Sequence, residues 1–280
     1  MKVTLWGTRG SLGCYGPEVV RYGGNTSCVE VRAADGGLVV LDAGTGVRRL
    51  SATVGPDVQR VDVLLTHLHM DHIQGLGFFG PLYRPGLDVR VWGPPSTTLH
   101  LRERLSRYLS PPLFPVRLRD VPCRLSLQDV PFGRFEIGNL TVTADLVCHP
   151  GPTVGYRIEE GGASLAYVSD HEPALGARRF PEEPQWTSGF DLVAGADLLI
   201  HDAQYDDDEY PEHVGWGHPS LSQAVAFAAA AGVRRFVTFH HDPSHSDDQL
   251  DAMLERVRRS GPLPLELVAG KEGASFRLVA

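Results

Sequence analysis

Four side chains that commonly bind metals stand close together, directly after an apolar segment. His67, His69, Asp71 and His72 follow the strand-like residues 61–65. Alternate residues of an extended segment share a face, so His67 and His69 can point the same way, while the other two fall where the chain must turn. Two imidazoles at one point, with a carboxylate and an imidazole nearby, suit a pair of divalent metals. The spacing therefore predicts a dinuclear metal site at the end of this strand.

Further histidines and aspartates follow other strand-like segments, at positions where the active sites of sheet proteins commonly lie. These residues are His149, Asp170, His201, Asp202, His240 and His241. A dinuclear site needs more ligands than residues 67–72 supply, so the missing ligands are expected among them. Asp42, which follows another apolar segment, is expected to shape a loop near the metals rather than bind one.

The elements that must position these side chains are short strands with helices interspersed, in an order that repeats about twice. Apolar runs predict strands at residues 2–6, 28–31, 38–41, 61–65, 89–92 and 235–239, and a β region from 133 to 168. Capping residues and glycines or prolines predict helices from Ser96 or Thr97 to Leu109, from Ser220 to Gly232 and from Ser246 to Gly261. This order favours an α/β fold of two packed sheets with outer helices, a four-layer αββα sandwich formed by one domain over residues 1–280.

Composition and charge restrict the class of protein. The chain has 280 residues and a formal net charge of −8. No run of about 18 apolar residues occurs, so we expect a cytoplasmic protein with no membrane contact. The four cysteines are scattered and are expected to be reduced. Arginines are spread out, apart from short clusters at residues 102–107 and 256–259. A protein that grips long nucleic acid usually has a basic face, and none is evident here.

The motifs give the chain a family resemblance. HLHMDH at residues 67–72 matches the H-x-H-x-D-H signature, and the chain resembles the metallo-β-lactamase superfamily over nearly its whole length. It is most similar to the ribonuclease Z and cyclic-phosphodiesterase branch. The motifs that carry this similarity are GTRGSLG (7–13), LVVLDAGTG (38–46), HDAQY (201–205) and GHPS (217–220).

The resemblance implies a role for each candidate residue. Site one would be formed by His67, His69 and His149; site two by Asp71, His72 and His240; and Asp170 would bridge both metals. His240 is preferred to His241 because it directly follows the strand. The cofactors would be two divalent ions, with zinc favoured and manganese or iron as alternatives.

Three residues are predicted to take part in catalysis: Asp71, His218 and Asp202. By resemblance, His218 would not bind metal but would protonate the leaving group, and Asp202 would orient it. The predicted reaction is hydrolysis of a phosphodiester by hydroxide held between the two metals.

The chain differs from the family it resembles in one segment, and this difference affects which partner is expected. Ribonuclease Z enzymes that bind tRNA usually carry a long basic arm between the third histidine and the bridging aspartate. Here residues 150–169 separate these positions and contain one arginine, Arg157. Together with the acidic balance, this favours a small phosphodiester substrate, such as a cyclic nucleotide, and no long nucleic acid. A homodimer is compatible with the sequence.

Other functions remain open at this point. A lactone, thioester or carboxyl-ester hydrolase could use the same centre, as could an RNA-processing enzyme similar to ribonuclease Z. A di-iron oxidoreductase is disfavoured because its relatives carry an acidic residue where this chain has His69. A binding module without activity is disfavoured by the complete ligand set.

Overall fold

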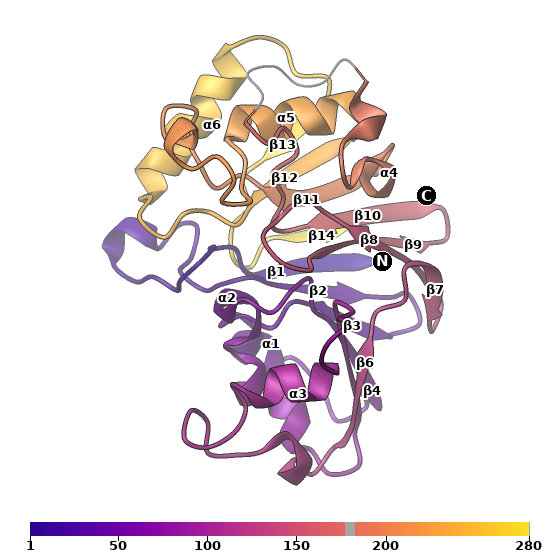
Figure 1. Ribbon diagram of the computed structural model, residues 1–280. Coiled ribbons are helices and arrows are strands. Elements are labelled where there is room, and N and C mark those ends of the chain that lie inside the picture. The colour runs from indigo at the N-terminus through magenta and orange to yellow at the C-terminus, as the bar shows by residue number, and fades with distance from the viewer. Residues whose placement is uncertain (177–182, 280) are drawn as a thin grey trace.

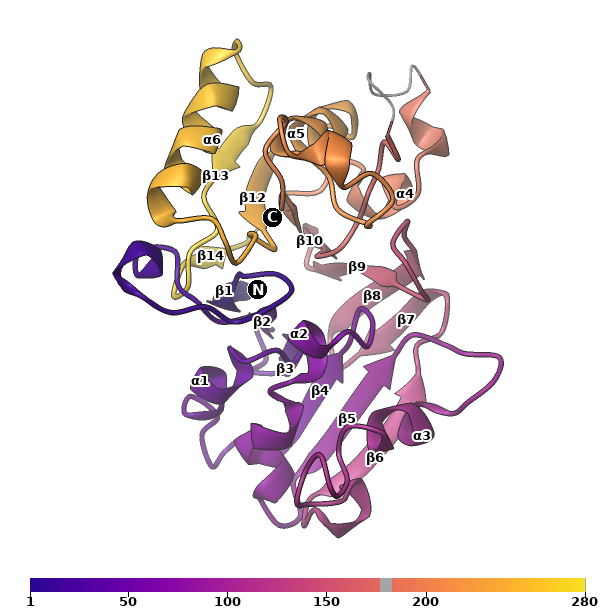
Figure 2. The same cartoon turned by 60° about the vertical axis from the view of Figure 1, so that its left-hand side comes forward.

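Two mixed β-sheets lie face to face, and helices cover the outer side of each sheet (Figures 1 and 2). The computed structural model describes residues 1–176 and 183–279. The predicted four-layer αββα sandwich is confirmed. Each sheet contains seven strands, and the two halves of the chain build one sheet each, apart from the last strand.

The first sheet has the strand order β14-β1-β2-β3-β4-β5-β6. Its strands are β1 (Lys2–Gly7), β2 (Cys28–Arg32), β3 (Leu38–Leu41), β4 (Arg60–Leu64), β5 (Asp88–Gly93), β6 (Arg124–Asp129) and β14 (Ser275–Arg277). Strands β3 to β6 run parallel, so their carboxyl ends meet at one edge of the sheet. Helices α1 (Val47–Ser51), α2 (Met70–Ile73) and α3 (Leu101–Ser106) belong to this half of the chain.

The second sheet has the order β13-β12-β11-β10-β9-β8-β7. Its strands are β7 (Gly133–Ile137), β8 (Leu140–Leu146), β9 (Val154–Glu160), β10 (Ala163–Val168), β11 (Leu198–Asp202), β12 (Arg235–Phe239) and β13 (Glu266–Val268). Strands β10 to β13 are parallel. Helices α4 (Phe190–Val193), α5 (Leu221–Ala230) and α6 (Asp247–Arg259) cover its outer face (Figure 1).

Short 3-10 helices occur in the connections. They are η1 (Pro17–Val19), η2 (Leu76–Phe78), η3 (Gly80–Tyr83), η4 (Leu118–Asp120), η5 (Pro184–Trp186) and η6 (Tyr210–Glu212). Within the described residues, no helix combines the length and the apolar character that crossing a bilayer requires.

Three apolar layers separate the four structural layers. The middle layer joins the inner faces of the two sheets, with residues such as Leu5, Val142 and Ile200. The outer layers join each sheet to its helices. Strands β3 and β10 are buried along their whole length because both of their faces are covered, which explains their continuous apolar sequences.

The last strand closes the first sheet at its edge. Strand β14 pairs antiparallel with β1, with Val3 opposite Phe276. The amide of Leu278 donates to the Met1 carbonyl, and the Met1 amino group donates to the Leu278 carbonyl at 2.9 Å. Strand β1 is therefore held between β2 and the carboxyl end of the chain.

Most predicted elements are present, but β6, β13 and β14 were not predicted, and α3 differs from its expected bounds. This helix begins at Leu101, later than the expected Ser96 or Thr97. The Ser96 hydroxyl instead accepts the amides of Thr98 and Leu99 at 3.3 and 3.4 Å, a local arrangement that competes with a helix. Helices α5 and α6 begin as expected, because Ser220 and Ser246 form capping boxes.

Candidate metal centre

The predicted ligands come together where loops of both sheets meet. Residues 67–72 follow β4, and the remaining three, His149, Asp170 and His240, follow β8, β10 and β12. Their ligand atoms form two groups, and within each group the atoms lie within 4.8 Å of one another. We call these the open group (His67, His69 and His149) and the enclosed group (Asp71, His72, Asp170 and His240).

The open group consists of three imidazoles that are held neutral. The Nδ1 atom of His69 lies 3.3 Å from Nε2 of His149. Burial lowers the pKa of all three histidines, and that of His149 falls to about 4. A neutral imidazole has a lone pair available for a metal. His69 is exposed, although the His67 and His149 rings are covered, so solvent reaches this group through His69.

The enclosed group pairs carboxylates with imidazoles, and all four residues are buried. The Asp71 Oδ2 atom lies 3.0 Å from Nε2 of His240 and 3.1 Å from Nε2 of His72. Although burial opposes both charges, the pKa of Asp71 is lowered by His72 and His240, and the pKa of His72 is raised by Asp170 and Asp71. The two carboxylates thus create negative charge that a cation would neutralise.

Asp170 lies between the two groups. Its Oδ1 atom is 3.1 Å from Nε2 of His72, and its Oδ2 atom is 3.2 Å from Nε2 of His240. Oδ2 is also 3.8 Å from Nε2 of His67 and 3.9 Å from Nε2 of His149. Burial would favour a neutral Asp170, but His240 and His72 lower its pKa overall. One carboxylate therefore faces ligand atoms of both groups.

The hydrogen-bonding of the donor atoms is incomplete in a way that divalent ions could satisfy. The His67 Nε2 atom is buried without a hydrogen-bond partner, and its nearest carboxylate oxygen, Asp170 Oδ2, is 3.8 Å away. Leaving such an atom unpaired costs about 1–3 kcal/mol. A buried imidazole nitrogen aimed at a carboxylate but too far to bond it is the pattern expected of a metal site.

Most imidazoles of the two groups are oriented by a hydrogen bond at the other ring nitrogen. Asp42 lies 2.8 Å from Nδ1 of His72 and also accepts the hydroxyl of Tyr167 at 2.8 Å. Gln204 Oε1 accepts Nδ1 of His240 at 2.8 Å, and the Gly217 carbonyl accepts Nδ1 of His149 at 3.1 Å. Such contacts fix the ring orientation and the tautomer of a ligand.

Glu172 anchors the loop that carries Gly217. Its buried carboxylate accepts the Tyr210 hydroxyl at 2.7 Å, the Gly215 amide at 3.0 Å and the Gly217 amide at 2.9 Å. The carbonyl of the same residue, Gly217, accepts from His149. Glu172 and Gln204 were not predicted as functional residues, and only their positions, each two residues after a candidate Asp, could have pointed to them.

The opening loop of the chain also reaches the centre. The Ser11 amide donates to Oδ2 of Asp71 at 2.8 Å. Gly10 lies so close to His240 that an added Cβ would stand 2.3 Å from Nδ1 of that ring. The glycine-rich motif at residues 7–13 therefore packs directly on the enclosed group.

His218 and Asp202 form a pair beside both groups. Nδ1 of His218 is 2.7 Å from Oδ2 of Asp202. The His218 ring stacks on His240, with centroids 4.8 Å apart, and lies 5.0 Å from the His149 ring. Burial raises the pKa of Asp202 and lowers that of His218, so it disfavours the charged form of both groups.

Two other candidates lie outside the two groups. The His241 ring bonds to the Gly270 carbonyl at 3.0 Å, so the structure places His240, not His241, with the other ligands. His201 contacts Nδ1 of His171 at 2.9 Å and the Asp202 carbonyl at 2.7 Å.

Comparison with known proteins gives the family of the chain. Residues 38–241 match the family described as the beta-lactamase superfamily domain. A ribonuclease Z of Mycolicibacterium gilvum is 29% identical over 283 residues, which cover 90% of this chain and 87% of that protein. A ribonuclease Z of Kineococcus radiotolerans is 30% identical over 251 residues, covering 76% and 77%.

Solved structures share the fold. Zn²⁺-bound PqqB from Methylobacterium extorquens has a TM-score of 0.71 and 20% identity, covering 99% of this chain and 100% of its own. The short form of human tRNase Z has a TM-score of 0.67 and 19% identity, covering 100% of both chains.

These comparisons correct one prediction. The expectation of no long nucleic-acid partner is wrong, because relatives along most of the chain are ribonucleases Z, which act on RNA. The expectation was based on the net charge of −8 and on the short segment 150–169. A total charge says nothing about how charges are distributed, and one missing insertion does not remove other binding surfaces. The predicted superfamily is confirmed: the chain belongs to the beta-lactamase superfamily and is a hydrolase of that superfamily.

Proposed function

We propose that this protein hydrolyses phosphodiester bonds of RNA with the help of two divalent metal ions. The observation that carries the proposal is the position of Asp170 between the open and the enclosed group, with the His218–Asp202 pair beside both. Relatives named ribonuclease Z support RNA as the substrate class.

In this proposal each group holds one ion. His67, His69 and His149 would bind the first, Asp71, His72 and His240 the second, and Asp170 would contribute to both. Zinc is favoured because imidazole and carboxylate donors suit it, and manganese or iron could occupy the same donors. When bound, such a pair supplies an activated water and neutralises charge on a phosphoryl group.

The chain's own residues would complete the reaction. His218 would protonate the leaving alkoxide through Nε2, because its Nδ1 is engaged by Asp202. Asp202 would hold that imidazole in one orientation. Asp71 would be kept in place by the Ser11 amide, and the solvent-facing His69 marks the side from which a phosphodiester could approach.

A small phosphodiester is a second candidate substrate. The segment between His149 and Asp170 consists mainly of the hairpin of β9 and β10, whose strands are joined by the two residues Gly161 and Gly162. This short hairpin carries no long insertion that could serve as an RNA-binding arm. A compact substrate would not need such an arm to reach the centre.

Metal analysis combined with a substrate comparison tests the proposal. We expect about two divalent ions per chain and hydrolysis of both a precursor transfer RNA and bis(p-nitrophenyl) phosphate. Hydrolysis should stop when the ions are removed and return when zinc or manganese is added. A protein that holds its ions but cleaves only lactones or thioesters would overturn the phosphodiesterase assignment.

A further inference from the structure

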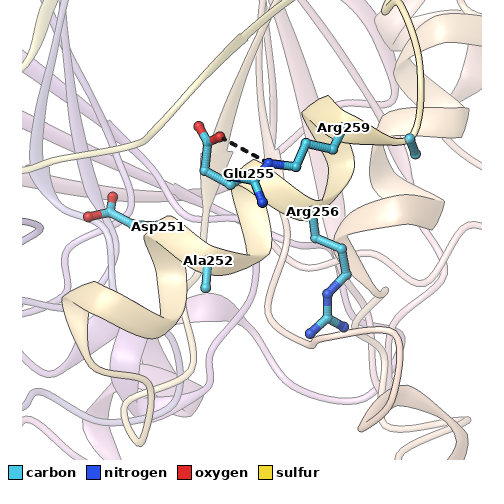
Figure 3. Close-up of a pocket in the computed structure, with 6 residues that line it drawn as sticks. Asp251, Ala252, Glu255, Arg256 and Arg259 are labelled. Carbon is cyan, nitrogen blue, oxygen red and sulfur yellow. Dashed lines mark ion pairs between the residues drawn. The ribbon is translucent and has the colours of Figure 1, made fainter.

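Arginines gather in two parts of the chain, and their surroundings differ. On α6 each arginine of the cluster at 256–259 has an acidic partner. Arg256 lies 2.7 Å from Asp206, while Arg258 and Arg259 lie 3.2 and 3.9 Å from Glu255. Figure 3 shows the Glu255–Arg259 pair on the exposed surface of this helix. Each of these arginines therefore has a carboxylate nearby, and Arg258 and Arg259 share that of Glu255.

The second arginine-rich part is the segment 101–124, which spans α3 and η4. It contains six arginines and only two acidic residues, in a chain whose net charge is −8. Arg102, Arg107 and Arg117 are exposed, and none of them forms an ion pair with a carboxylate in the described part of the chain. Arg119 pairs only with its neighbour Asp120, at 3.6 Å in an exposed position, where an ion pair neutralises little.

The buried side of this segment is attached to the metal centre. The Tyr108 hydroxyl donates to the Gln74 carbonyl at 2.5 Å, and Gln74 directly follows α2, which carries Asp71 and His72. The Phe114 ring packs on Phe78, with centroids 5.4 Å apart. Figure 2 shows α2 and α3 on the same outer side of the first sheet. Arg102 and Arg107, which precede Tyr108 in the sequence, thus stand on a surface that is fixed to the turn holding two candidate ligands. Arg117 lies farther along the same segment, near the start of β6 and toward the opposite edge of the parallel strands.

We propose that segment 101–124 holds the phosphate backbone of an RNA whose scissile bond lies at the metal centre, an inference that rests on the proposed function. An acidic protein repels a polyanion over most of its surface, so binding requires a local basic area. One guanidinium group can bind two phosphate oxygens at once. Each such contact also releases counterions from the nucleic acid. Arginines without carboxylate partners can do this without first breaking an ion pair.

The triple variant R102A/R107A/R117A tests the inference. RNA affinity is measured by fluorescence anisotropy at several salt concentrations, with ions present and with an RNA that is not cleaved. We expect about tenfold or greater loss of affinity at low salt, and a salt slope shallower by roughly 2–3, because each phosphate contact contributes about 0.7–0.9. Hydrolysis of bis(p-nitrophenyl) phosphate should stay at the wild-type rate.

Two further variants make the result specific. The matched control R234A/R256A/R259A removes the same charge from arginines that already have carboxylate partners, and it should bind RNA like the wild type. The variant R102K/R107K/R117K keeps the charge and should recover most of the affinity. Thermal unfolding confirms that each variant is folded.

The possible failures are distinguishable. Equal RNA affinity in the triple variant and the control would overturn the surface assignment and leave the proposed function intact. Binding of anionic lipid vesicles instead of RNA would also overturn it. A wild-type protein that holds two ions but hydrolyses neither substrate would overturn the proposed function, and the RNA surface with it.

Discussion

The open and the enclosed group differ in their exposure to solvent. All four residues of the enclosed group are buried, and they combine two carboxylates with two imidazoles. The open group has imidazoles only, and His69 is exposed. Buried charges need fixed partners, and the enclosed group receives them from Asp42, Gln204 and the Ser11 amide.

This difference indicates a division of roles. The enclosed group is held from several sides and can keep an ion in one position. The open group depends on fewer contacts, among them the Gly217 carbonyl that orients His149. Exchange of ions and approach of a substrate should therefore occur at the open side.

Replacing the residue that joins the two groups should have the largest effect. In Asp170→Ala both ions lose a ligand, and activity should fall by about 10⁴-fold or more, because the ions contribute several kcal/mol and each 1.36 kcal/mol is tenfold. Elemental analysis together with steady-state kinetics measures this. Loss of one ion only, with the other retained at full occupancy, would contradict the shared position of Asp170.

His218→Ala separates proton transfer from metal binding. We expect activity to fall by roughly 10²–10⁴-fold, while both ions remain. The loss should shrink for substrates whose leaving group needs no proton, such as a nitrophenolate. If the variant instead loses an ion, His218 belongs with the ligands rather than beside them.

Glu172→Gln is expected to weaken the open group alone. The substituted amide cannot accept all three donors of Glu172, so the Gly217 peptide shifts and His149 loses its orientation. Losing such a contact typically weakens metal binding by about 10–100-fold. Titration with a competing chelator should show weaker binding of one ion and unchanged binding of the other.

Tyr210→Phe is the control for this variant. It removes a single donor to Glu172 and leaves the Gly215 and Gly217 amides in place, so its effect on metal affinity should be smaller. Equal weakening of both ions in Glu172→Gln would argue against separate groups.

The smallest expected effect is a difference in the rates at which the two ions leave the wild-type protein. A chelator should take the ion at the open group first, because solvent reaches His69 while the enclosed group is covered. Time-resolved metal analysis should show two phases of release. A single phase that removes both ions together would mean that the exposure of His69 has no kinetic consequence.

The grouping of the candidate metal ligands was accessible from the sequence because its signal is local. Residues 67–72 follow one strand, His240 directly follows another, and Asp170 is the second residue after a third. The structure brings all of them together with His149. The sequence could not decide firmly between the adjacent residues His240 and His241. In the structure the His240 ring contacts Asp71, whereas the His241 ring contacts the Gly270 carbonyl.

Other features depend on contacts between distant segments. Glu172 acts on a loop more than forty residues away, and nothing at position 172 indicates a partner at 215 or 217. Strands β6, β13 and β14 were missed because all three are edge strands with partly exposed side chains. The start of α3 was misplaced because Ser96 can form either a helix cap or a local turn.

The pairing of β14 with β1 has a consequence for how the protein matures. The loop that delivers the Ser11 amide to Asp71 continues from β1, whose outer edge stays unpaired until residues 275–277 have been synthesised. Because β2 already pairs with the other edge of β1, a growing chain can place β1 early. The seven-stranded sheet is complete, however, only after every candidate ligand has been synthesised.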